Sequence, residues 1–448
     1  MKKPSISVVG AGYVGLCTAV GFAKKGYNVV ASDNEAEKVA KINEGVPPFF
    51  EPNLQEMLEE TIQDGTFKCF LNQTEKAVLE TDITFIAVGT PSKSDGSIDL
   101  KFIESSSCDI GKALCKKNAY HVVVVKSTVV PGTTQDIVKP ILETESKKTC
   151  GLGFGLCMNP EFLRQGSAFK DTLHADRLVI GEHDRKSGDT LESLYKDFYG
   201  NDVPPTIRTT ISTAELIKYA SNSFLATKIS FINTIANMCE KIPGADVKVV
   251  ATAMGLDKRI GPLFLDAGLG YGGSCFPKDV KALIAHSRSL GYHPQLLEDA
   301  ENVNNTQPLR AVELCKEQLG NLKDKNIAIL GLAFKPDTDD MREARVIPII
   351  NQLTQEGAKV TAYDPVAIPV AKTIFKNKIQ YATSTIDCLK NADCCIIVTE
   401  WDEFKKLTPE DYVQNMRQPI LIDGRRIYDR KQFSQKLKFE AIGLGPRN

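Results

Sequence analysis

The sequence has almost no net charge and no long apolar run, and each absence excludes a class of function. Lys and Arg total 55 residues against 56 Asp and Glu, so non-specific binding to nucleic acid or to an anionic membrane is not expected. No stretch approaches the roughly 18 consecutive apolar residues that a membrane helix needs. The opening residues, "MKKPSISVVGAGYVG", are broken by glycines, which predicts a strand and a turn rather than a signal peptide.

The sequence also lacks the cysteine and histidine spacing that a metal site needs. The 12 cysteines and 5 histidines include no C-x-x-C pair and no histidine cluster, so no metal is expected. A reducing cytoplasm suits so many thiols, and most of them are expected to be buried apolar residues. Cys394 and Cys395 lie within an apolar run and are interpreted as core residues.

The pattern of apolar runs predicts an α/β fold with two Rossmann-like, doubly wound domains. The chain has 448 residues, of which 42% are hydrophobic, which is enough for two or three domains. Strand-like and helix-like stretches alternate up to about residue 182, and the pattern restarts at "KNIAILGLAF". Such alternation predicts parallel sheets covered by helices on both faces. Residues 213–242 contain no Pro or Gly and are apolar nearly all round, which predicts a long buried helix and suggests burial by a second subunit.

A glycine-rich turn follows the first predicted strand. In "GAGYVG", Gly10, Gly12 and Gly15 would allow a tight turn, close approach of a pyrophosphate and close packing of helix on strand. The second strand ends at Asp33, whose carboxylate can accept hydrogen bonds from both ribose hydroxyls. That carboxylate would repel a ribose phosphate, so NAD is favoured over NADP. The alternative is an ordinary surface Asp beside a coincidental turn.

One cysteine stands between a run of glycines and a predicted helix start. In "GYGGSCFPKD", Ser274 or Cys275 would cap a helix that has Pro277 in its first turn. The helix dipole and Lys278 would lower the pKa of the thiol. Asp279 would share a helix face with Cys275, and the glycines at 270, 272 and 273 would let a substrate approach the backbone. The residues alone leave open whether this thiol is a nucleophile or a structural residue.

Lys218 and Asn222, in "ELIKYASNSF", lie four residues apart on the predicted long helix and would share a face. An ammonium and an amide there can hold an alcohol or carbonyl oxygen and stabilise negative charge on it. A solvated helix face is the ordinary alternative, but a lysine on a largely apolar helix needs a reason.

Two further stretches place charged residues after predicted strands. In "NPEFLRQGSAF", Glu161 lies in a loop at the carboxyl edge of a parallel sheet, where functional residues concentrate. In "GLAFKPDTDDMRE", Lys335 and Arg342 follow the first strand of the second α/β domain and would suit a phosphate. A solvated loop carboxylate and a surface salt bridge are the alternatives.

Taken together, these motifs resemble the UDP-glucose/GDP-mannose dehydrogenase family over nearly the whole chain. The resemblance rests on "GVPPFFEPNLQEML", "GTPSKSDGSIDL", "KSTVVPGTT", "NPEFLRQG", "RIGPLFLDAGLGYGGSCFPKD", "GLAFKPDTDDMRE" and "IVTEWDEF". It favours a catalytic role for Cys275. It implies an NAD-binding Rossmann domain at 1–210, a central helical domain with the long linking helix and the cysteine loop at 211–320, and a Rossmann-like UDP-sugar-binding domain at 321–448.

The activity that the resemblance implies is a four-electron oxidation of the 6-hydroxyl of UDP-glucose to UDP-glucuronate, with two NAD used in succession. Cys275 would hold the intermediate aldehyde as a thiohemiacetal and then as a thioester. Lys218 and Asn222 would stabilise the oxyanion. A water held by Asp279 and Lys218 would act as the first base, and Glu161 would lie near the hydrolytic water.

Three alternatives stay open. A sister activity on UDP-N-acetylmannosamine or GDP-mannose would use the same catalytic residues. A two-electron β-hydroxyacid dehydrogenase would need neither Cys275 nor a third domain. A nucleotide-sugar or NAD sensor without turnover would not need the thiol.

The resemblance also implies individual site positions. The apolar character of residues 213–242 favours a homodimer through the central helix, with higher oligomers as an option. The catalytic positions are Cys275, Lys218, Asn222, Asp279, Glu161 and Thr128. The cofactor positions are Gly10, Gly12, Gly15, Asp33, Lys38, Thr90, Thr128, Gln165, Lys278 and Arg342. The substrate positions are Glu161, Phe162, Leu163, Arg164, Gln165, Lys218, Asn222, Arg259, Phe264, Leu265, Asp266, Ala267, Gly268, Gly272, Lys335 and Arg425. Arg259 is a candidate to reach a neighbouring subunit's site. Gln165 replaces the family's usual Glu, so it is given no acid or base role.

Overall fold

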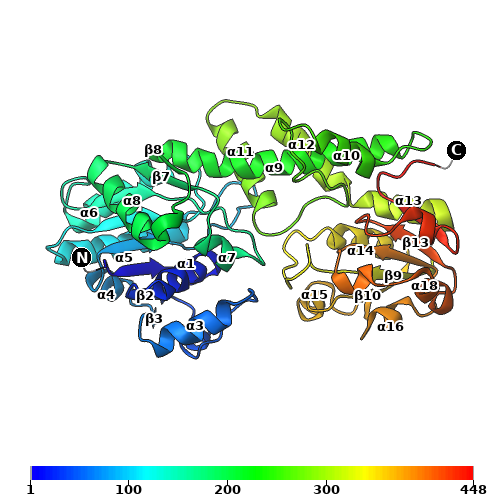
Figure 1. Cartoon of the computed structure of the whole chain (residues 1–448), viewed down its shortest axis with the longest axis horizontal. Coiled ribbons are helices and arrows are strands. Elements are labelled where there is room, and N and C mark those ends of the chain that lie inside the picture. The colour runs from blue at the N-terminus through cyan, green and yellow to red at the C-terminus, as the bar shows by residue number, and fades with distance from the viewer. Residues whose placement is uncertain (1–2, 447–448) are drawn as a thin grey trace. The chain divides into compact units, whose positions relative to one another are not determined.

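The chain divides into two compact units, Met1–Ser221 and Asn222–Asn448. The structure is a computed structural model that describes residues 3–446. Each unit contains one sheet (Figure 1), and the units are described separately below.

The first unit is built on an eight-stranded sheet with the order β3-β2-β1-β4-β5-β6-β7-β8. Its strands are β1 Ile6–Val9, β2 Val29–Asp33, β3 Phe67–Leu71, β4 Ile83–Ile86, β5 Val122–Val125, β6 Gly155–Met158, β7 Leu178–Glu182 and β8 Thr206–Thr210. Neighbouring strands are parallel except β6 and β7, which are antiparallel. The prediction of a wholly parallel sheet is therefore wrong at this pair. Residues 159–177 contain only the short helix α7 (Ala168–Leu173), so the chain turns back at the carboxyl edge instead of crossing the sheet.

Helices cover both faces of this sheet, as the apolar strand sequences predict. Val122 and Val124 pack in one hydrophobic cluster with α1 (Tyr13–Lys24) and α8 (Arg185–Tyr199). Val123 and Val125 pack in another with α5 (Lys101–Lys116) and α6 (Lys139–Ser146), because successive strand residues point to opposite faces. The other helical segments of this unit are α2 Ala36–Asn43, α3 Leu54–Gln63, α4 Thr74–Leu79, the π-helix η1 Thr134–Val138 and the 3-10 helix η2 Gly200–Asp202.

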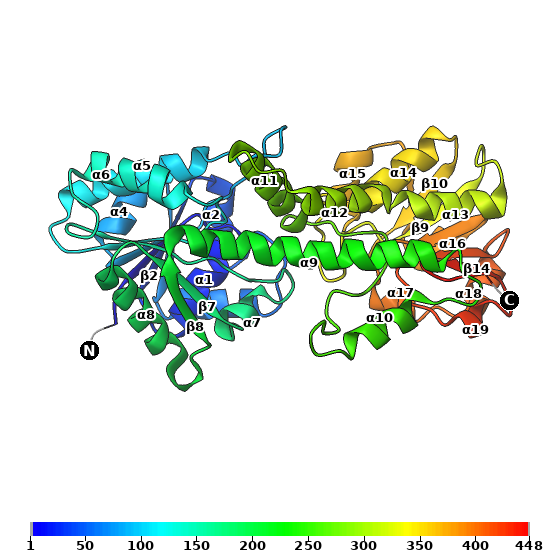
Figure 2. The ribbon, with the colours of Figure 1, turned by 90° about the horizontal axis from the view of Figure 1, so that it is seen from above.

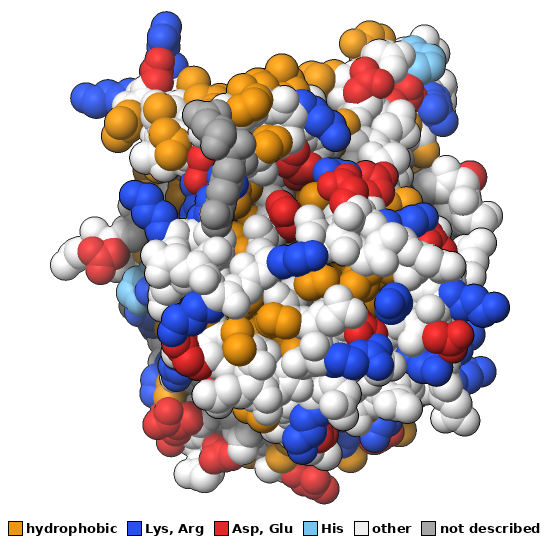
Figure 3. Space-filling view, turned by 90° about the vertical axis from the view of Figure 1, so that its right-hand side faces the viewer, with side chains coloured by type: hydrophobic (Ala, Val, Ile, Leu, Met, Phe, Trp, Pro, Cys, Tyr) orange, Lys and Arg blue, Asp and Glu red, His pale blue; other side chains and the backbone are white. Residues whose placement is uncertain are grey.

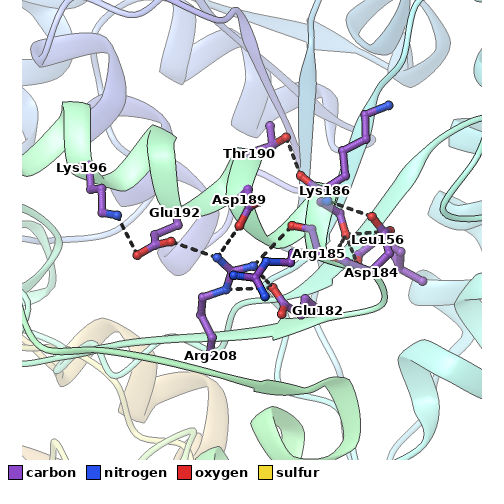
Figure 4. A network of polar contacts seen from close by, with 11 residues as sticks. Leu156, Glu182, Asp184, Arg185, Lys186, Asp189, Thr190, Glu192, Lys196 and Arg208 are labelled. Atoms are coloured by element: carbon purple, nitrogen blue, oxygen red, sulfur yellow. Dashed lines mark hydrogen bonds and ion pairs between the residues drawn. The ribbon is translucent and has the colours of Figure 1, made fainter.

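A charge network ties α8 to the strands at the sheet edge (Figure 4). The Arg208 guanidinium on β8 lies 2.9 Å from Glu182 on β7 and 3.0 Å from Glu192 on α8. Gly188 leaves room for this contact, since a Cβ there would stand 1.5 Å from the Glu182 carboxylate. Charged side chains on an edge strand also discourage pairing with another chain.

The long helix α9 spans Ile211–Cys239, 29 residues, and is continuous in Figure 2. The helix is confirmed, although it ends before residue 242. The expectation that this apolar helix is buried nearly all round is wrong for a single chain. Phe224, Phe231 and Met238 are 65%, 49% and 55% exposed, and their seven-residue spacing places them on one stripe.

The second unit is built on a six-stranded parallel sheet with the order β11-β10-β9-β12-β13-β14. Its strands are β9 Asn326–Leu330, β10 Lys359–Tyr363, β11 Gln380–Tyr381, β12 Cys394–Ile397, β13 Ile420–Asp423 and β14 Lys438–Ala441. Its helices, after α9, are α10 Val247–Gly255, α11 Phe276–Ser289, α12 Gln295–Thr306, α13 Leu309–Leu319, α14 Val346–Gln355, α15 Ile368–Phe375, α16 Thr385–Leu389, α17 Asp402–Lys405, α18 Pro409–Asn415 and α19 Arg430–Phe433.

Both sheets reverse their strand order once, between β1 and β4 and between β9 and β12. Ligands of such folds bind at this switch point, beyond the carboxyl ends of the strands. The predicted α/β class with two doubly wound sheets is confirmed.

The surface and the cysteines agree with the composition. Nine of the 12 cysteines are buried, including Cys394 and Cys395 on β12, which confirms them as core residues. Over the face in Figure 3, charges of both signs are interspersed and hydrophobic side chains gather along the upper edge. Among residues 3–446, no helix has the length and apolar content to cross a bilayer, and no group of acidic, histidine and cysteine side chains could hold a metal ion.

Candidate active site

The three glycines of the first turn have three different surroundings. Gly10 has φ 94°, and a Cβ there would stand 2.7 Å from the Ala87 carbonyl oxygen. A Cβ on Gly15 would stand 1.8 Å from the Gly10 carbonyl oxygen, so Gly15 allows helix α1 to pack on the strand. Gly12, the N-cap of α1, has nothing within 4 Å of its Cβ position. The start of α1 is therefore open for a phosphate group, as the motif predicts.

Asp33 ends β2 beside this turn. Its Oδ2 accepts a hydrogen bond of 2.7 Å from the Ala11 N–H, and the ammonium of Lys38 lies 3.3 Å from Oδ1. Asp33 and Lys38 line one cleft together with Gly10 and Gly12. The structure thus brings these four predicted cofactor residues together, and their chemistry fits a dinucleotide with an unmodified ribose.

Two predicted threonines meet at the same edge of the sheet. Thr90 follows β4 and Thr128 follows β5, and the Thr90 hydroxyl donates a hydrogen bond of 2.9 Å to the Thr128 carbonyl oxygen. The ends of two neighbouring strands are joined at the point where a cofactor would extend from the glycine-rich turn.

Glu161 and Lys218 form a buried ion pair. The Lys218 Nζ lies 2.9 Å from Glu161 Oε1, and both side chains are less than a tenth exposed. The Leu163 N–H donates to Glu161 Oε2 at 2.6 Å. Burial acts to raise the pKa of Glu161, but Lys218 and the Leu163 N–H hold that pKa below its usual value. The carboxylate is therefore ionised at neutral pH. The sequence predicted both residues but not their pairing.

The rest of the Glu161–Gln165 segment is anchored to the start of α1. The Gly166 N–H donates to the Tyr13 hydroxyl at 2.8 Å and to Glu51 at 2.9 Å, and the Tyr13 hydroxyl donates to Glu51. Arg164 forms two hydrogen bonds with Asp171, of 3.0 and 2.6 Å. Glu51 and Tyr13 were not predicted. Both lie within quoted motifs, but nothing in their spacing indicates that they meet.

Cys275 is the N-cap of α11, with Pro277 in the first turn, as predicted. The Cys275 side chain is exposed, and the Asp279 N–H donates to the Cys275 carbonyl oxygen at 2.8 Å. The Gly273 N–H donates to the Arg342 carbonyl oxygen at 2.9 Å, which joins the cysteine loop to the loop after β9. The pKa of Arg342 is raised, first by its hydrogen bonds to Asp340 and also by the charge of the Cys275 thiolate. Arg342 is therefore a cation beside the thiol, a role that the sequence did not indicate.

Asp279 is buried and accepts two side-chain hydrogen bonds. The Asn222 amide donates to it at 2.6 Å and the Lys278 ammonium at 2.5 Å. Lys278 was predicted as a cation beside the thiol and as a cofactor contact, and the structure places its ammonium on Asp279. Asn222 and Lys218 thus each have a carboxylate partner of their own.

The packing of the cysteine loop requires the glycines before Cys275. A Cβ on Gly270 would stand 2.5 Å from the Asn304 side chain, and one on Gly273 would stand 2.7 Å from the Phe334 ring. On Gly272 it would stand 2.4 Å from the Glu343 carbonyl oxygen. Protein atoms fill these Cβ positions, so packing by itself requires glycine here, and the approach of a substrate to this backbone stays a prediction. These glycines let the cysteine loop pack against neighbouring segments.

Further predicted substrate residues gather at the carboxyl edge of the second sheet. Arg425 follows β13, and its guanidinium donates to the Val398 carbonyl oxygen at 2.6 Å and to that of Gly270 at 3.4 Å. A Cβ on Gly268 would stand 3.3 Å from the same guanidinium. Arg259, in contrast, is exposed and pairs with Asp257 of its own loop at 2.6 Å.

Phe264 and Lys335 lie near aromatic rings of the same unit. Phe264 has φ 65°, and its ring centroid lies 5.9 Å from that of Phe276, the residue after the catalytic cysteine candidate. The Lys335 ammonium lies 5.7 Å from the centroid of the Phe334 ring, in the loop after β9. Phe264 and Lys335 therefore each lie beside an aromatic residue that adjoins the cysteine loop.

The second sheet carries a counterpart of Asp33 that cannot serve a ribose. Asp364 follows β10 and is 1% exposed. Its Oδ2 accepts hydrogen bonds from the Leu332 N–H at 2.7 Å and from the Trp401 indole at 3.1 Å. The protein itself uses this carboxylate, so the first unit suits a dinucleotide and the second does not.

Family models for three successive domains match the chain. They describe the UDP-glucose/GDP-mannose dehydrogenase family: the NAD binding domain at residues 4–199, the central domain at 212–306 and the UDP binding domain at 328–430. The chain belongs to the UDP-glucose/GDP-mannose dehydrogenase family. The predicted membership and the predicted NAD cofactor are both confirmed.

Relatives of this dehydrogenase match nearly its whole length. UDP-glucose 6-dehydrogenase AglM of Haloferax volcanii is 45% identical over 430 residues, which are 95% of the chain and 98% of the relative. UDP-glucose 6-dehydrogenase YwqF of Bacillus subtilis is 42% identical over 424 residues, 95% of the chain and 94% of the relative. A solved UDP-glucose dehydrogenase from Pyrobaculum islandicum has a TM-score of 0.91 at 39% identity and covers 99% of the chain and 98% of its own. The prediction of an NAD-dependent dehydrogenase is thus confirmed, while the roles of single residues and the three domain boundaries stay predictions.

Proposed function

We propose that this dehydrogenase oxidises UDP-glucose to UDP-glucuronate, removing four electrons and reducing two NAD. Eight relatives that are 38–45% identical to the chain are all named UDP-glucose 6-dehydrogenase. A solved UDP-D-ManNAc dehydrogenase from Pyrococcus horikoshii is 28% identical, with a TM-score of 0.86 over 98% of this chain and 99% of its own. The observation that carries the proposal is the exposed Cys275 thiol at the N-cap of α11, beside Arg342. A two-electron dehydrogenase would need no such thiol.

NAD would be held by the open turn at Gly12, by Asp33 and by the edge formed by Thr90 and Thr128. Bound NAD accepts the hydride in each of the two oxidations. Asp33 would receive the ribose hydroxyls, and the free N–H groups at the start of α1 would receive the pyrophosphate.

The first oxidation converts the 6-hydroxyl to an aldehyde. A water held by Asp279 and Lys218 takes the hydroxyl proton as the C–H hydride leaves. Lys218 is paired with Glu161 at 2.9 Å, and Asp279 is paired with Lys278 at 2.5 Å. Thr128, which follows β5 in the first unit, is a further proposed catalytic residue.

The second oxidation takes place on the cysteine. The Cys275 Sγ adds to the aldehyde carbon, and the oxygen becomes the hydroxyl of a thiohemiacetal, with Lys218 and Asn222 donating hydrogen bonds to it as charge develops. Loss of its hydrogen as hydride and of the hydroxyl proton gives a thioester. Water then adds to the acyl carbon, the C–S bond breaks, Sγ leaves as the thiolate, and Glu161 accepts the water's proton.

A panel of sugar nucleotides tests directly which substrate the enzyme prefers. UDP-glucose, UDP-N-acetylmannosamine and GDP-mannose are each supplied with NAD, and NADH is followed by its absorbance. We expect kcat/KM for UDP-glucose to exceed the other two by at least about 100-fold, since a pocket that leaves a buried polar group unpaired rejects the wrong sugar strongly. Equal or higher rates with another sugar would replace the proposed substrate.

A homodimer through α9 is the second part of the proposal. Phe224, Phe231 and Met238 form an exposed apolar stripe on this helix, and such stripes mark protein interfaces. A copy of the same chain is the proposed partner, and higher oligomers can form from such dimers. The buried thiols favour a reducing cytoplasm as the compartment, where UDP-glucuronate would serve polysaccharide biosynthesis.

A further inference from the structure

Lys126 is a buried lysine that opens the motif "KSTVVPGTT" but has no role in the proposed mechanism. It directly follows β5, and its backbone N–H continues the sheet by donating to the Ile86 carbonyl oxygen at 2.8 Å. The residue is only 8% exposed. Removing an ammonium from water costs several kcal/mol unless a counter-charge lies near, so its position needs an explanation.

The Lys126 side chain holds the start of the Glu161 segment. Its Nζ donates to Asn159 Oδ1 at 2.9 Å, and Asn159 lies two residues before Glu161. The same oxygen accepts the Tyr195 hydroxyl at 2.5 Å, and the Asn159 amide donates to the Val179 carbonyl oxygen at 2.9 Å. The Asn159 side-chain amide thus joins residues at or near the ends of β5, β6 and β7. These hydrogen bonds fix the backbone two residues before Glu161.

The charge of Lys126 also acts on the Glu161 carboxylate. Lys126 and Glu161 line the same cavity in the first unit. Burial acts to raise the pKa of Glu161, Lys218 and the Leu163 N–H lower it, and the Lys126 charge adds to this decrease. Burial lowers the pKa of Lys126 itself to about 8, with Lys218 adding to the decrease and Glu161 opposing it. Glu161 thus lies in the field of two ammonium groups.

Other charged or titratable side chains also line this cavity. Asp171 is paired with Arg164 at 2.6 Å, and Arg177 stacks on the Phe162 ring at 3.7 Å. The remaining groups on the cavity wall are His174, Asp176, Tyr195 and Tyr199. For both Glu161 and Lys126, the charged partners that shift the pKa are the other member of this pair and Lys218.

We infer that Lys126 is a positioning residue that keeps Glu161 ionised and in place for hydrolysis of the acyl intermediate. The inference rests on the proposed function. It assigns Lys126 no contact with substrate. It requires that loss of the second ammonium makes Glu161 protonate at a higher pH, so that fewer molecules can accept a proton from water in mild acid.

Lys126→Met, Lys126→Arg and Lys117→Met test the inference in the full-length enzyme. Lys117 is a matched control, because it is also a buried lysine of the first unit and donates to the Val78 carbonyl oxygen at 2.7 Å. For Lys126→Met we expect the acid limb of the kcat profile to move up by about one pH unit, with KM for UDP-glucose and NAD within about twofold of the wild type. Lys126→Arg should restore the limb, and Lys117→Met should leave it in place.

Two outcomes overturn the inference. One is an acid limb of the kcat profile that does not move in Lys126→Met. The other is an equal shift of that limb in Lys117→Met, which would show that loss of any buried lysine produces the effect by lowering stability. If Lys126→Met does not fold, carbon-13 NMR of the Glu161 carboxyl in the wild type decides. Two inflections are expected, one from Glu161 and one near pH 8 from Lys126, and a single inflection rejects the inference. The yield of NADH per UDP-glucose, measured separately on the wild type, shows whether the proposed function itself has failed.

Discussion

The Asn222 amide donates a hydrogen bond of 2.6 Å to the buried carboxylate of Asp279. The same carboxylate receives the Lys278 ammonium. Asp279 therefore orients an amide on α9 and a lysine on its own helix α11, so removing its charge should disturb two predicted site residues at once.

Asp279→Asn tests this arrangement. We expect kcat to fall by about 100-fold or more, because the Asn222 and Lys278 donors lose their charged acceptor and the water that acts as the first base loses the carboxylate that holds it. Steady-state kinetics with UDP-glucose and NAD measure the effect. Asp299→Asn is the control, since Asp299 accepts a hydrogen bond from Gln295 between neighbouring turns of α12, and it should behave as the wild type. A fall of less than threefold in Asp279→Asn would remove Asp279 from the mechanism.

Substitution of Asp33, which ends β2, should have a different effect from substitution of Asp364, which follows β10. Asp33→Ala should raise KM for NAD by about tenfold, the equivalent of 1.4 kcal/mol, and improve the relative use of NADP. Asp364→Asn should lower the melting temperature, because Asp364 accepts backbone N–H groups and the Trp401 indole. It should leave KM for NAD unchanged. A weaker affinity for NAD in Asp364→Asn alone would reverse the assignment of the cofactor to the first unit.

Glu215 predicts a specific pH dependence of stability. It is fully buried and accepts the Gly132 and Thr134 N–H groups at 2.7 and 2.8 Å, and burial raises its pKa to about 7. Between about pH 4.5 and 7 the folded state keeps a proton that the unfolded chain releases, so this residue's contribution to stability falls as pH rises.

The measurement is denaturant unfolding of the wild type and of Glu215→Gln at pH 5 and pH 7.5. The wild type should lose up to about 3 kcal/mol more than the variant between these two pH values. A parallel pH dependence in both proteins would show that Glu215 does not titrate in this range.

The stripe on α9 predicts that a charge will break the dimer. Phe231→Asp places a carboxylate in the middle of the stripe between Phe224 and Met238, and burying it unpaired is costly. Size-exclusion chromatography with light scattering should show a dimer for the wild type and a shift toward monomer for the variant. Leu152→Asp is the control, because Leu152 is exposed on the first unit. A dimer that survives Phe231→Asp would exclude α9 as the interface.

Local signals explain which site features were predictable. The turn at Gly10 to Gly15 and the position of Asp33 belong to one strand, turn, helix and strand that are consecutive in the sequence. Their pattern can therefore be recognised from the sequence alone. The position of Cys275 at a helix start follows from Pro277 two residues later. Each of these depends on residues within one supersecondary unit.

The features that were missed join segments far apart in the chain. The pairing of Glu161 with Lys218 and the approach of Arg342 to Cys275 depend on how strands order themselves in the sheets. The antiparallel direction of β7 was missed because the apolar pattern of a buried strand is the same for both directions. The glycines before Cys275 were predicted to face substrate, but only the packed structure shows what fills their Cβ positions.

The yield of NADH from limiting UDP-glucose tests the central claim, that Cys275 carries the sugar through a second oxidation. With excess NAD, the wild-type enzyme should form two NADH for each UDP-glucose, and Cys275→Ala should form no net acid. A wild-type yield of one NADH for each UDP-glucose would contradict the four-electron mechanism.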